Sequence, residues 1–285
     1  VYPINTALGC GFRCNFCINV ILKKKYKMRS AEEIVDRIRF LQKEFGANYI
    51  HLNDENFFGS KERTCKFVEL ILRNDIKIKW RPSVRANYFN KDYINESFVT
   101  ELEKSGMVIA VMGAESASQK TLDRLRKGIK VEDIHRAVEI LSKTKIIPRA
   151  SFMVGIPGET EEDIKETYRL AVELKEKYPT FQPAILPFRL YPGSELYDLA
   201  INKYGYKPPE NLIDWVNLND TEYNESLGYQ NFDCYKWITD KETFRLRNNV
   251  HSTYYPVAWK VSPLVINKGL NAKLKYLAIY LLYKI

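Results

Sequence analysis

The chain has 285 residues, of which 45% are hydrophobic and 28% are charged. This composition is typical of a folded protein that can bury a large core, and it excludes disordered and fibrous classes. The formal net charge of +9 comes from scattered basic residues more than from one dense block, so it would suit an anionic substrate, nucleic acid or an acidic lipid surface without choosing among them.

The hydrophobic pattern predicts a regular alternation of strands and helices along the chain. Apolar runs indicate strands at residues 1–8, 49–53, 76–84, 107–112, 148–154 and 184–190. Helical spacing indicates helices at residues 31–45, 60–72, 97–104, 161–177 and 195–204, with two more that open at Ser118 and Val131. Ser30 and Thr160 are each followed three residues later by an acidic residue, which predicts capping boxes.

Six strand-then-helix units with near-continuous apolar strands predict an α/β fold of parallel strands covered by helices. In such folds the working residues lie at the carboxyl ends of the strands, where polar and glycine-rich segments are found here. A doubly wound nucleotide-binding sheet is the alternative. However, no Gly-x-Gly-x-x-Gly turn follows the first strand, and a cysteine-rich loop occupies its place.

That loop carries Cys10, Cys14 and Cys17 within eight residues. Three thiols so close together do not suit a disulfide framework, because one stays unpaired and the loops would be strained. The spacing suits a metal centre with three thiolate ligands and one open position, as in some iron–sulfur sites. Zinc is the first rival, although no second ligand pair follows, and a chance cluster of buried thiols is the plain alternative. Cys65 and Cys234 stand alone.

With Phe16 just before its last cysteine, the loop resembles the signature of the radical S-adenosylmethionine (radical SAM) enzymes. The resemblance implies that Cys10, Cys14 and Cys17 hold three irons of a [4Fe–4S] cluster and that S-adenosylmethionine chelates the fourth. It also implies reductive cleavage of S-adenosylmethionine to a 5′-deoxyadenosyl radical. The fold that it implies is a partial (β/α)6 TIM-like barrel, which matches the six predicted units.

Other strand-end segments resemble cofactor-binding motifs of one subgroup of that family. The resemblance implies that Asp54 or Glu55 receives the methionyl amino group and that Glu115 contacts the methionyl or ribose part. Arg85 lies where the subgroup often carries an arginine, although it could instead pair with a neighbouring carboxylate. The residues expected to bind cofactor are Phe16, Asp54, Glu55, Arg85, Glu115, Ser116, Gly155, Ile156 and Pro157.

The subgroup includes enzymes with a cobalamin-binding domain before the barrel, such as the anaerobic magnesium-protoporphyrin ester cyclase, and many radical methyltransferases. Here the first predicted strand lies almost at residue 1, so we expect either a fragment of such a protein or a member without that domain. Cobalamin is therefore left open as a cofactor.

We expect the barrel to occupy residues 1–204 and an aromatic-rich extension to occupy residues 205–285, where it would cap the barrel. Residues 264–285 combine leucines with lysines, which predicts an amphipathic helix. That helix could rest on a membrane surface and serve a lipid-linked substrate, or it could dock onto the barrel.

The expected function is cleavage of S-adenosylmethionine followed by hydrogen abstraction or methyl transfer at an unactivated carbon of a small-molecule or lipid-linked substrate. A flavodoxin- or ferredoxin-like protein would supply the electron. The alternatives are an iron–sulfur electron-transfer protein and a tRNA-modifying radical SAM enzyme, although no RNA-binding module is recognised. We expect a cytoplasmic, anaerobic setting, because no export signal and no membrane-spanning run is recognised.

Overall fold

The computed structural model describes residues 1–23 and 25–215, so most of the expected extension and its terminal helix lie outside the described residues. The strands are β1 Tyr2–Ile4, β2 Ala7–Leu8, β3 Lys27–Met28, β4 Tyr49–Leu52, β5 Lys79–Arg81, β6 Ser83–Val84, β7 Ile109–Glu115, β8 Ile147–Val154 and β9 Gln182–Pro187. The helices are α1 Ile18–Ile21, α2 Ala31–Phe45, α3 Lys61–Arg73, α4 Glu96–Lys104, α5 Gln119–Arg124, α6 Val131–Ser142, α7 Glu161–Lys177 and α8 Glu195–Tyr204, with short 3₁₀ turns η1 Phe57–Gly59 and η2 Ala86–Tyr88.

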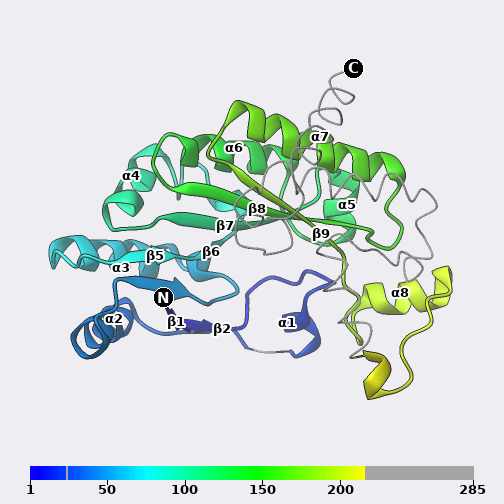
Figure 1. Cartoon of the computed structure of the whole chain (residues 1–285), viewed down its shortest axis with the longest axis horizontal. Coiled ribbons are helices and arrows are strands. Elements are labelled where there is room, and N and C mark those ends of the chain that lie inside the picture. The colour runs from blue at the N-terminus through cyan, green and yellow to red at the C-terminus, as the bar shows by residue number, and fades with distance from the viewer. Residues whose placement is uncertain (24, 216–285) are drawn as a thin grey trace, which may run out of the picture.

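The main strands form two parallel groups, in the orders β1-β4-β5 and β6-β7-β8-β9. A parallel bridge between Trp80 and Met107 joins the two groups. Strands β5 and β6 occupy one strand position, which is interrupted at Pro82 because proline has no amide hydrogen to donate. Six parallel strand positions therefore follow one another in chain order, as the sequence predicts. Figure 1 shows α6 and α7 along one margin of this sheet and α2 and α3 near the other.

Helix boundaries follow the predicted capping residues. The Ser30 hydroxyl accepts a hydrogen bond from the Glu33 amide, and the Glu33 carboxylate accepts one from the Ser30 amide, at 3.1 and 2.8 Å. Helix α2 ends at Phe45, and the residue after it, Gly46, has φ of +63°, a backbone conformation that favours glycine. Thr160 and Asp163 form the same reciprocal cap at the start of α7. Both predicted capping boxes are thus confirmed.

The first strand is shorter than predicted. Strand β1 ends at Ile4, and residues 7–8 form β2, which pairs antiparallel with β3. The break occurs because the amides of Thr6 and Ala7 donate to the side chain of Asp54, at 2.6 and 2.9 Å, and not to a neighbouring strand. The cysteine loop therefore leaves from a two-stranded hairpin directly beside the carboxyl end of β1.

Strand β7 is longer than predicted and runs to Glu115. Its register against β8 shifts between Gly113 and Glu115, and Glu115 has φ of +64°. A left-handed backbone at a non-glycine residue is unfavourable, and such residues concentrate at functional sites. The strand thus ends in a strained turn that presents a carboxylate.

Buried aromatic rings support the sheet beneath these strand ends. Trp80 of β5 lies 5.3 Å from Phe67 of α3 and 5.8 Å from Phe57 of η1, measured between ring centroids, and all three side chains are fully buried. The Trp80 indole donates to the carbonyl of Ser105 at 3.0 Å, so its polar group is satisfied. In the described ranges, no helix is both long enough and apolar enough to cross a bilayer.

Candidate metal centre

The three cysteines of the loop are all free thiols. Cys14 is buried, whereas Cys10 and Cys17 are half-buried. Burial raises the pKa of the Cys10 thiol, the Phe12 amide and Arg85 lower it, and Cys14 and Cys17 raise it further. The three thiols lie within eight residues, on the one loop that connects β2 to α1.

Two of the thiols accept hydrogen bonds from buried nitrogen donors. Asn19 donates to Cys17 Sγ at 3.7 Å, and Arg85 Nη1 donates to Cys14 Sγ at 3.9 Å. Donors of this kind orient sulfur ligands and stabilise their anionic form. The chemistry of the donor set therefore fits a thiolate-bound iron–sulfur cluster.

Within the part of the chain that the structure describes, no three Cys, His, Asp or Glu side chains converge on a single ion. Convergence of three ligands on one ion is the geometry of a mononuclear site such as zinc. In a [4Fe–4S] cluster each thiolate binds a different iron atom, so the sulfurs need not converge on one point. The arrangement of the thiols is thus compatible with a cluster.

The cysteine loop is anchored to the opposite side of the barrel mouth. Asn15, which is buried, donates its side-chain amide to the carbonyl of Arg124 at 2.8 Å and its backbone amide to the carbonyl of Leu125 at 3.2 Å. Phe16 packs edge-on against Phe188, with 6.5 Å between ring centroids. These contacts hold the loop against the end of α5 and a small apolar cluster that includes Leu125, Ile156, Phe188 and Leu196.

Arg85 lies beneath the same loop. Its side chain is buried, its guanidinium carbon lies 3.5 Å from the centroid of the Phe12 ring, and its Nη2 donates to the carbonyl of Lys127. Together with the contact to Cys14, these interactions place a permanent positive charge beside the thiols. The sequence suggested Arg85, but it did not suggest Phe12 as its partner.

Lys127 is a site residue that the sequence analysis missed. Its ammonium forms a 2.6 Å ion pair with Glu115, and both side chains are only 9% exposed. A Cβ at Gly113 would lie 2.4 Å from Glu115 Oε1 and 2.8 Å from Lys127 Nζ, so a larger residue there would displace the ends of these two side chains. One oxygen of Glu115 is thus bound by Lys127, whose carbonyl accepts from Arg85, and a contact of Glu115 with cofactor stays a prediction.

The two adjacent carboxylates after β4 have different environments. Asp54 is buried and accepts hydrogen bonds from the Thr6 amide, the Thr6 hydroxyl and the Ala7 amide. Glu55 is exposed and forms no ion pair with any described residue. Of the two candidates for the methionyl amino group, Asp54 is therefore committed to holding the chain between β1 and β2, and Glu55 is the available carboxylate.

We expect Asp54→Ala to destabilise the protein by about 2–4 kcal/mol, because two buried amides lose a charged acceptor. Chemical denaturation followed by circular dichroism measures this loss. Glu55→Ala is the matched control, since surface substitutions usually change stability by less than about 0.5 kcal/mol. Equal stability of the two variants would contradict the anchoring role of Asp54.

Ser116 lies in a hydrogen-bond network between the end of β7 and α7. Its hydroxyl is fully buried, lies 3.2 Å from the Thr167 hydroxyl of α7 and accepts from the Ser118 amide at 3.1 Å. The Ser118 hydroxyl in turn donates to Asp163 of α7 at 2.6 Å. The structure thus uses Ser116 to attach the end of β7 to α7, and the expected contact of Ser116 with cofactor stays a prediction.

The Gly155–Pro157 turn is held by Glu159. One oxygen of this buried carboxyl accepts from the Gly155 amide at 2.7 Å and the Ile156 amide at 3.1 Å, whereas Oε1 has no hydrogen-bond partner among the described residues. Burial raises the pKa of Glu159 to about 8, against the lowering effect of these two amides. Glu159 is therefore a buried support of the turn.

We expect the free energy of unfolding of Glu159→Gln to rise relative to that of wild type as the pH rises from about 5 to 8. In this window the folded protein retains a proton that the unfolded chain has lost, so wild-type stability falls as pH rises. Gln keeps an acceptor for the two amides and does not titrate. Thermal melts at several pH values test this, with the exposed Glu161→Gln as control; a pH-independent difference would contradict it.

Asn56 connects two tyrosines near Cys10. Its side-chain amide donates to the Tyr88 hydroxyl at 2.8 Å, and its backbone carbonyl accepts from the Tyr26 hydroxyl at 2.9 Å. Burial raises the pKa of Tyr26 to about 12, and Cys10 raises the pKa of both tyrosines slightly further. The tyrosines therefore stay neutral and close one flank of the cysteine loop, a feature that no sequence motif indicated.

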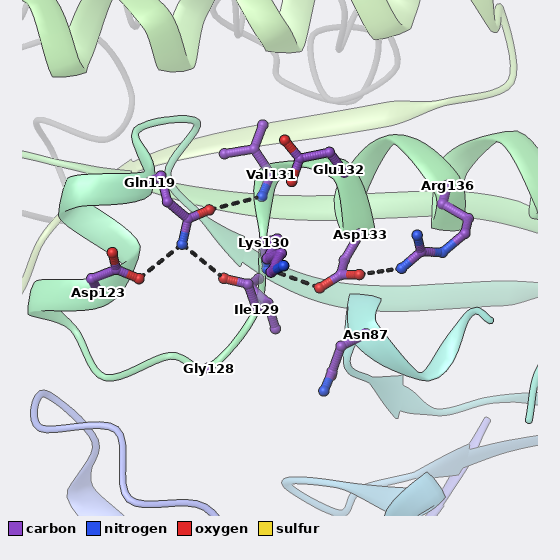
Figure 2. Close-up of a pocket in the computed structure, with 10 residues that line it drawn as sticks. All are labelled: Asn87, Gln119, Asp123, Gly128, Ile129, Lys130, Val131, Glu132, Asp133 and Arg136. Atoms are coloured by element: carbon purple, nitrogen blue, oxygen red, sulfur yellow. Dashed lines mark hydrogen bonds and ion pairs between the residues drawn. The ribbon is translucent and has the colours of Figure 1, made fainter. Parts of the chain in front are cut away.

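A cavity of about 1000 Å³ lies beside the loop that carries Lys127 and Gly128. Figure 2 shows that several lining groups bind one another: Gln119 contacts Asp123, the Ile129 carbonyl and the Val131 amide. These bonds brace the loop between α5 and α6, so that it can present Lys127 to Glu115.

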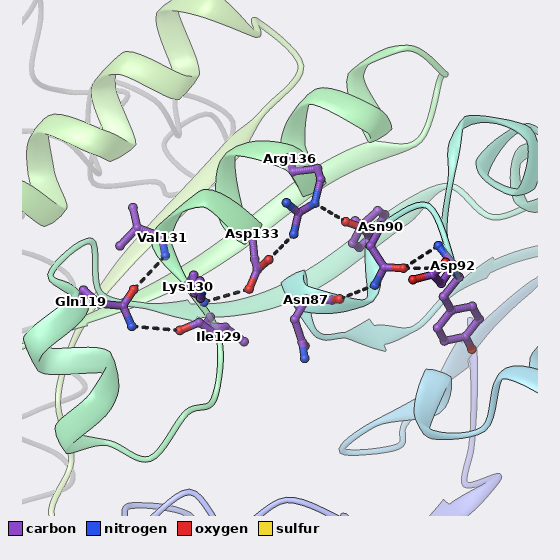
Figure 3. A network of polar contacts seen from close by, with 11 residues as sticks. Asn87, Asn90, Asp92, Gln119, Ile129, Lys130, Val131, Asp133 and Arg136 are labelled. Carbon is purple, nitrogen blue, oxygen red and sulfur yellow. Dashed lines mark hydrogen bonds and ion pairs between the residues drawn. The ribbon is translucent and has the colours of Figure 1, made fainter.

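The same cavity wall connects that loop to the segment after β6. Figure 3 shows Arg136 of α6 bound to Asp133. Nε of Arg136 also donates to the carbonyl of Phe89 at 2.6 Å. Asp133 also accepts from the Lys130 amide at 2.8 Å. Because Phe89 directly follows η2, which begins after Arg85, this network fixes Arg85 and Lys127 relative to each other.

Comparison with known proteins identifies the family of the fold. The model of the radical SAM superfamily matches residues 4–171. The chain is 30% identical to the anaerobic magnesium-protoporphyrin IX monomethyl ester cyclase of Rubrivivax gelatinosus over 59% of this chain and 30% of that protein. It is also 30% identical to an uncharacterized methyltransferase of Pyrococcus horikoshii over 70% of this chain and 41% of that protein. The chain thus spans less than half the length of these relatives.

Among solved structures, the radical SAM methyltransferase TsrM of Kitasatospora setae, with cobalamin and a [4Fe–4S] cluster bound, superposes with a TM-score of 0.59. The match covers 69% of this chain and 38% of that chain at 20% sequence identity, so it bears on the fold alone. Together with the six parallel strand positions, it confirms the expected partial (β/α)6 barrel.

Proposed function

Because the chain belongs to the radical SAM superfamily, we propose that its barrel holds a [4Fe–4S] cluster on Cys10, Cys14 and Cys17 and binds S-adenosylmethionine beside it. The observation that carries this proposal is one anchored loop with three free thiols next to the carboxyl end of the first parallel strand. When bound, the two cofactors supply a one-electron reductive cleavage that yields methionine and a 5′-deoxyadenosyl radical.

The residues of the chain orient the nucleoside by charge and shape. Glu55 binds the methionyl ammonium, because it is exposed at the end of β4. Glu115 accepts from the methionyl or ribose part through Oε2, since Lys127 holds Oε1. The backbone of residues 155–157 would hold the adenine, and Phe16, which packs on the apolar cluster that contains Ile156, would lie beside it.

The substrate would be a small molecule or a lipid-linked compound with an unactivated carbon, and its modification would be hydrogen abstraction or methyl transfer. The relatives support both outcomes, because one is named as a cyclase and another as a methyltransferase. A flavodoxin- or ferredoxin-like protein supplies the electron. TsrM also contains cobalamin, but we assign none of the described residues to that cofactor.

The test is to reconstitute the full chain with iron and sulfide without oxygen, add dithionite and S-adenosylmethionine, and measure 5′-deoxyadenosine by mass spectrometry. We expect 5′-deoxyadenosine from wild type and much less from Glu55→Gln, whose amide binds an ammonium more weakly. Formation of S-adenosylhomocysteine in the same sample would favour methyl transfer. A protein that carries the cluster but yields no 5′-deoxyadenosine would instead be an electron carrier.

A further inference from the structure

The guanidinium of Arg85 is a buried cation without a carboxylate partner in the described ranges. Its side chain is only 6% exposed, its Nε has no hydrogen-bond partner, and no ion pair involves it. Burying an unpaired charge is costly, so native proteins rarely keep one without a compensating anion. The structure therefore requires an anion near Arg85.

The groups around Arg85 identify that anion. Cys14 Sγ accepts a hydrogen bond from Nη1 of Arg85 at 3.9 Å. The remaining contacts, the Phe12 ring and the Lys127 carbonyl, are neutral. Nη1 and Nη2 each donate one hydrogen bond to a protein atom, and these two bonds hold the guanidinium against the cysteine loop.

We propose that Arg85 is a positioning residue that acts as counter-ion of the cluster and raises its reduction potential. This inference rests on the proposed ligand role of Cys10, Cys14 and Cys17. Three thiolates make the assembly anionic, and one-electron reduction makes it more anionic. A fixed cation and an N–H···S hydrogen bond therefore stabilise the reduced form more than the oxidised form.

The position of Arg85 is set by two contacts that do not involve the sulfurs. Phe12 belongs to the cysteine loop itself, so the cation–π contact attaches the guanidinium to the loop. The Lys127 carbonyl belongs to the loop braced by the network of Figure 3. The charge is thus preorganised before the cluster binds, which is the arrangement that shifts a potential most effectively.

The experiment compares Arg85→Met and Arg85→Lys with wild type and with Arg149→Met. Arg149 is a half-buried arginine in the amino-terminal half of β8 and is bound to Gln182. The substitution Arg149→Met therefore removes the same charge, but away from the carboxyl ends of the strands. Each protein is reconstituted without oxygen and analysed for iron and sulfide. The midpoint potential is then measured by a redox titration followed by electron paramagnetic resonance.

We expect the midpoint potential of the cluster in Arg85→Met to become more negative by at least about 59 mV, which corresponds to a tenfold change in the one-electron equilibrium. Arg85→Lys should shift less, and Arg149→Met should not shift. Cluster loss in Arg85→Met alone, with retention in Arg85→Lys, would also support the need for a positive charge.

An unchanged potential in loaded Arg85→Met would overturn the inference. So would loss of the cluster from both Arg85 variants, since the loop would then need the shape of arginine and not its charge. Failure of wild type to take up a cluster is a different outcome, because it would reject the proposed ligands themselves.

Discussion

Cys14→Ala is expected to abolish cluster binding, and with it the formation of 5′-deoxyadenosine. Cys14 is the most buried of the three thiols and the one that Arg85 contacts, and its loss leaves only Cys10 and Cys17 as thiols on the loop. Two thiolates on a short loop hold a cubane too weakly to survive purification. Iron and sulfide content and the visible absorption of the reconstituted protein measure the loss.

Cys65→Ala is the matched control for that substitution. Cys65 is a half-buried free thiol on α3, and the structure assigns it no place near the cysteine loop. The Cys65→Ala variant should retain the full cluster content. A cluster that persisted in Cys14→Ala, or vanished in Cys65→Ala, would contradict the ligand assignment.

Lys127→Met is expected to destabilise the fold by about 3–5 kcal/mol, because removal of one partner leaves the carboxylate of Glu115 buried and unpaired. The ion pair at 2.6 Å is the only compensation that the described residues offer to Glu115. Denaturant unfolding of the protein without cofactor measures this loss separately from any effect on catalysis.

Two further variants make the result specific. Glu115→Gln combined with Lys127→Met should recover part of the stability, since no charge then remains buried. Arg126→Met, on the same loop, breaks an exposed pair with Glu195 and should cost less than about 1 kcal/mol. Equal losses of unfolding free energy in Lys127→Met and Arg126→Met would show that the buried pair stabilises the fold no more than the exposed pair does.

Adjacent residues show where sequence reasoning reached its limit. Asp54 and Glu55 carry the same functional group and follow the same strand, yet one is buried among backbone amides and the other is exposed. The choice depends on where the chain after β1 passes, because the amides that bind Asp54 lie 47 and 48 residues away. No local pattern contains that information.

The amino-acid sequence by itself determined the six strand-and-helix units, the capping boxes at Ser30 and Thr160, and the loop of three thiols. These features depend on residues at most a few positions apart, whose contacts follow from backbone geometry. Only the tertiary structure decided that Arg85 reaches Cys14 across 71 residues and that Lys127 pairs with Glu115. The packing of whole strands and helices sets those distances, so the electrostatic surroundings of the thiols emerge only when the barrel forms.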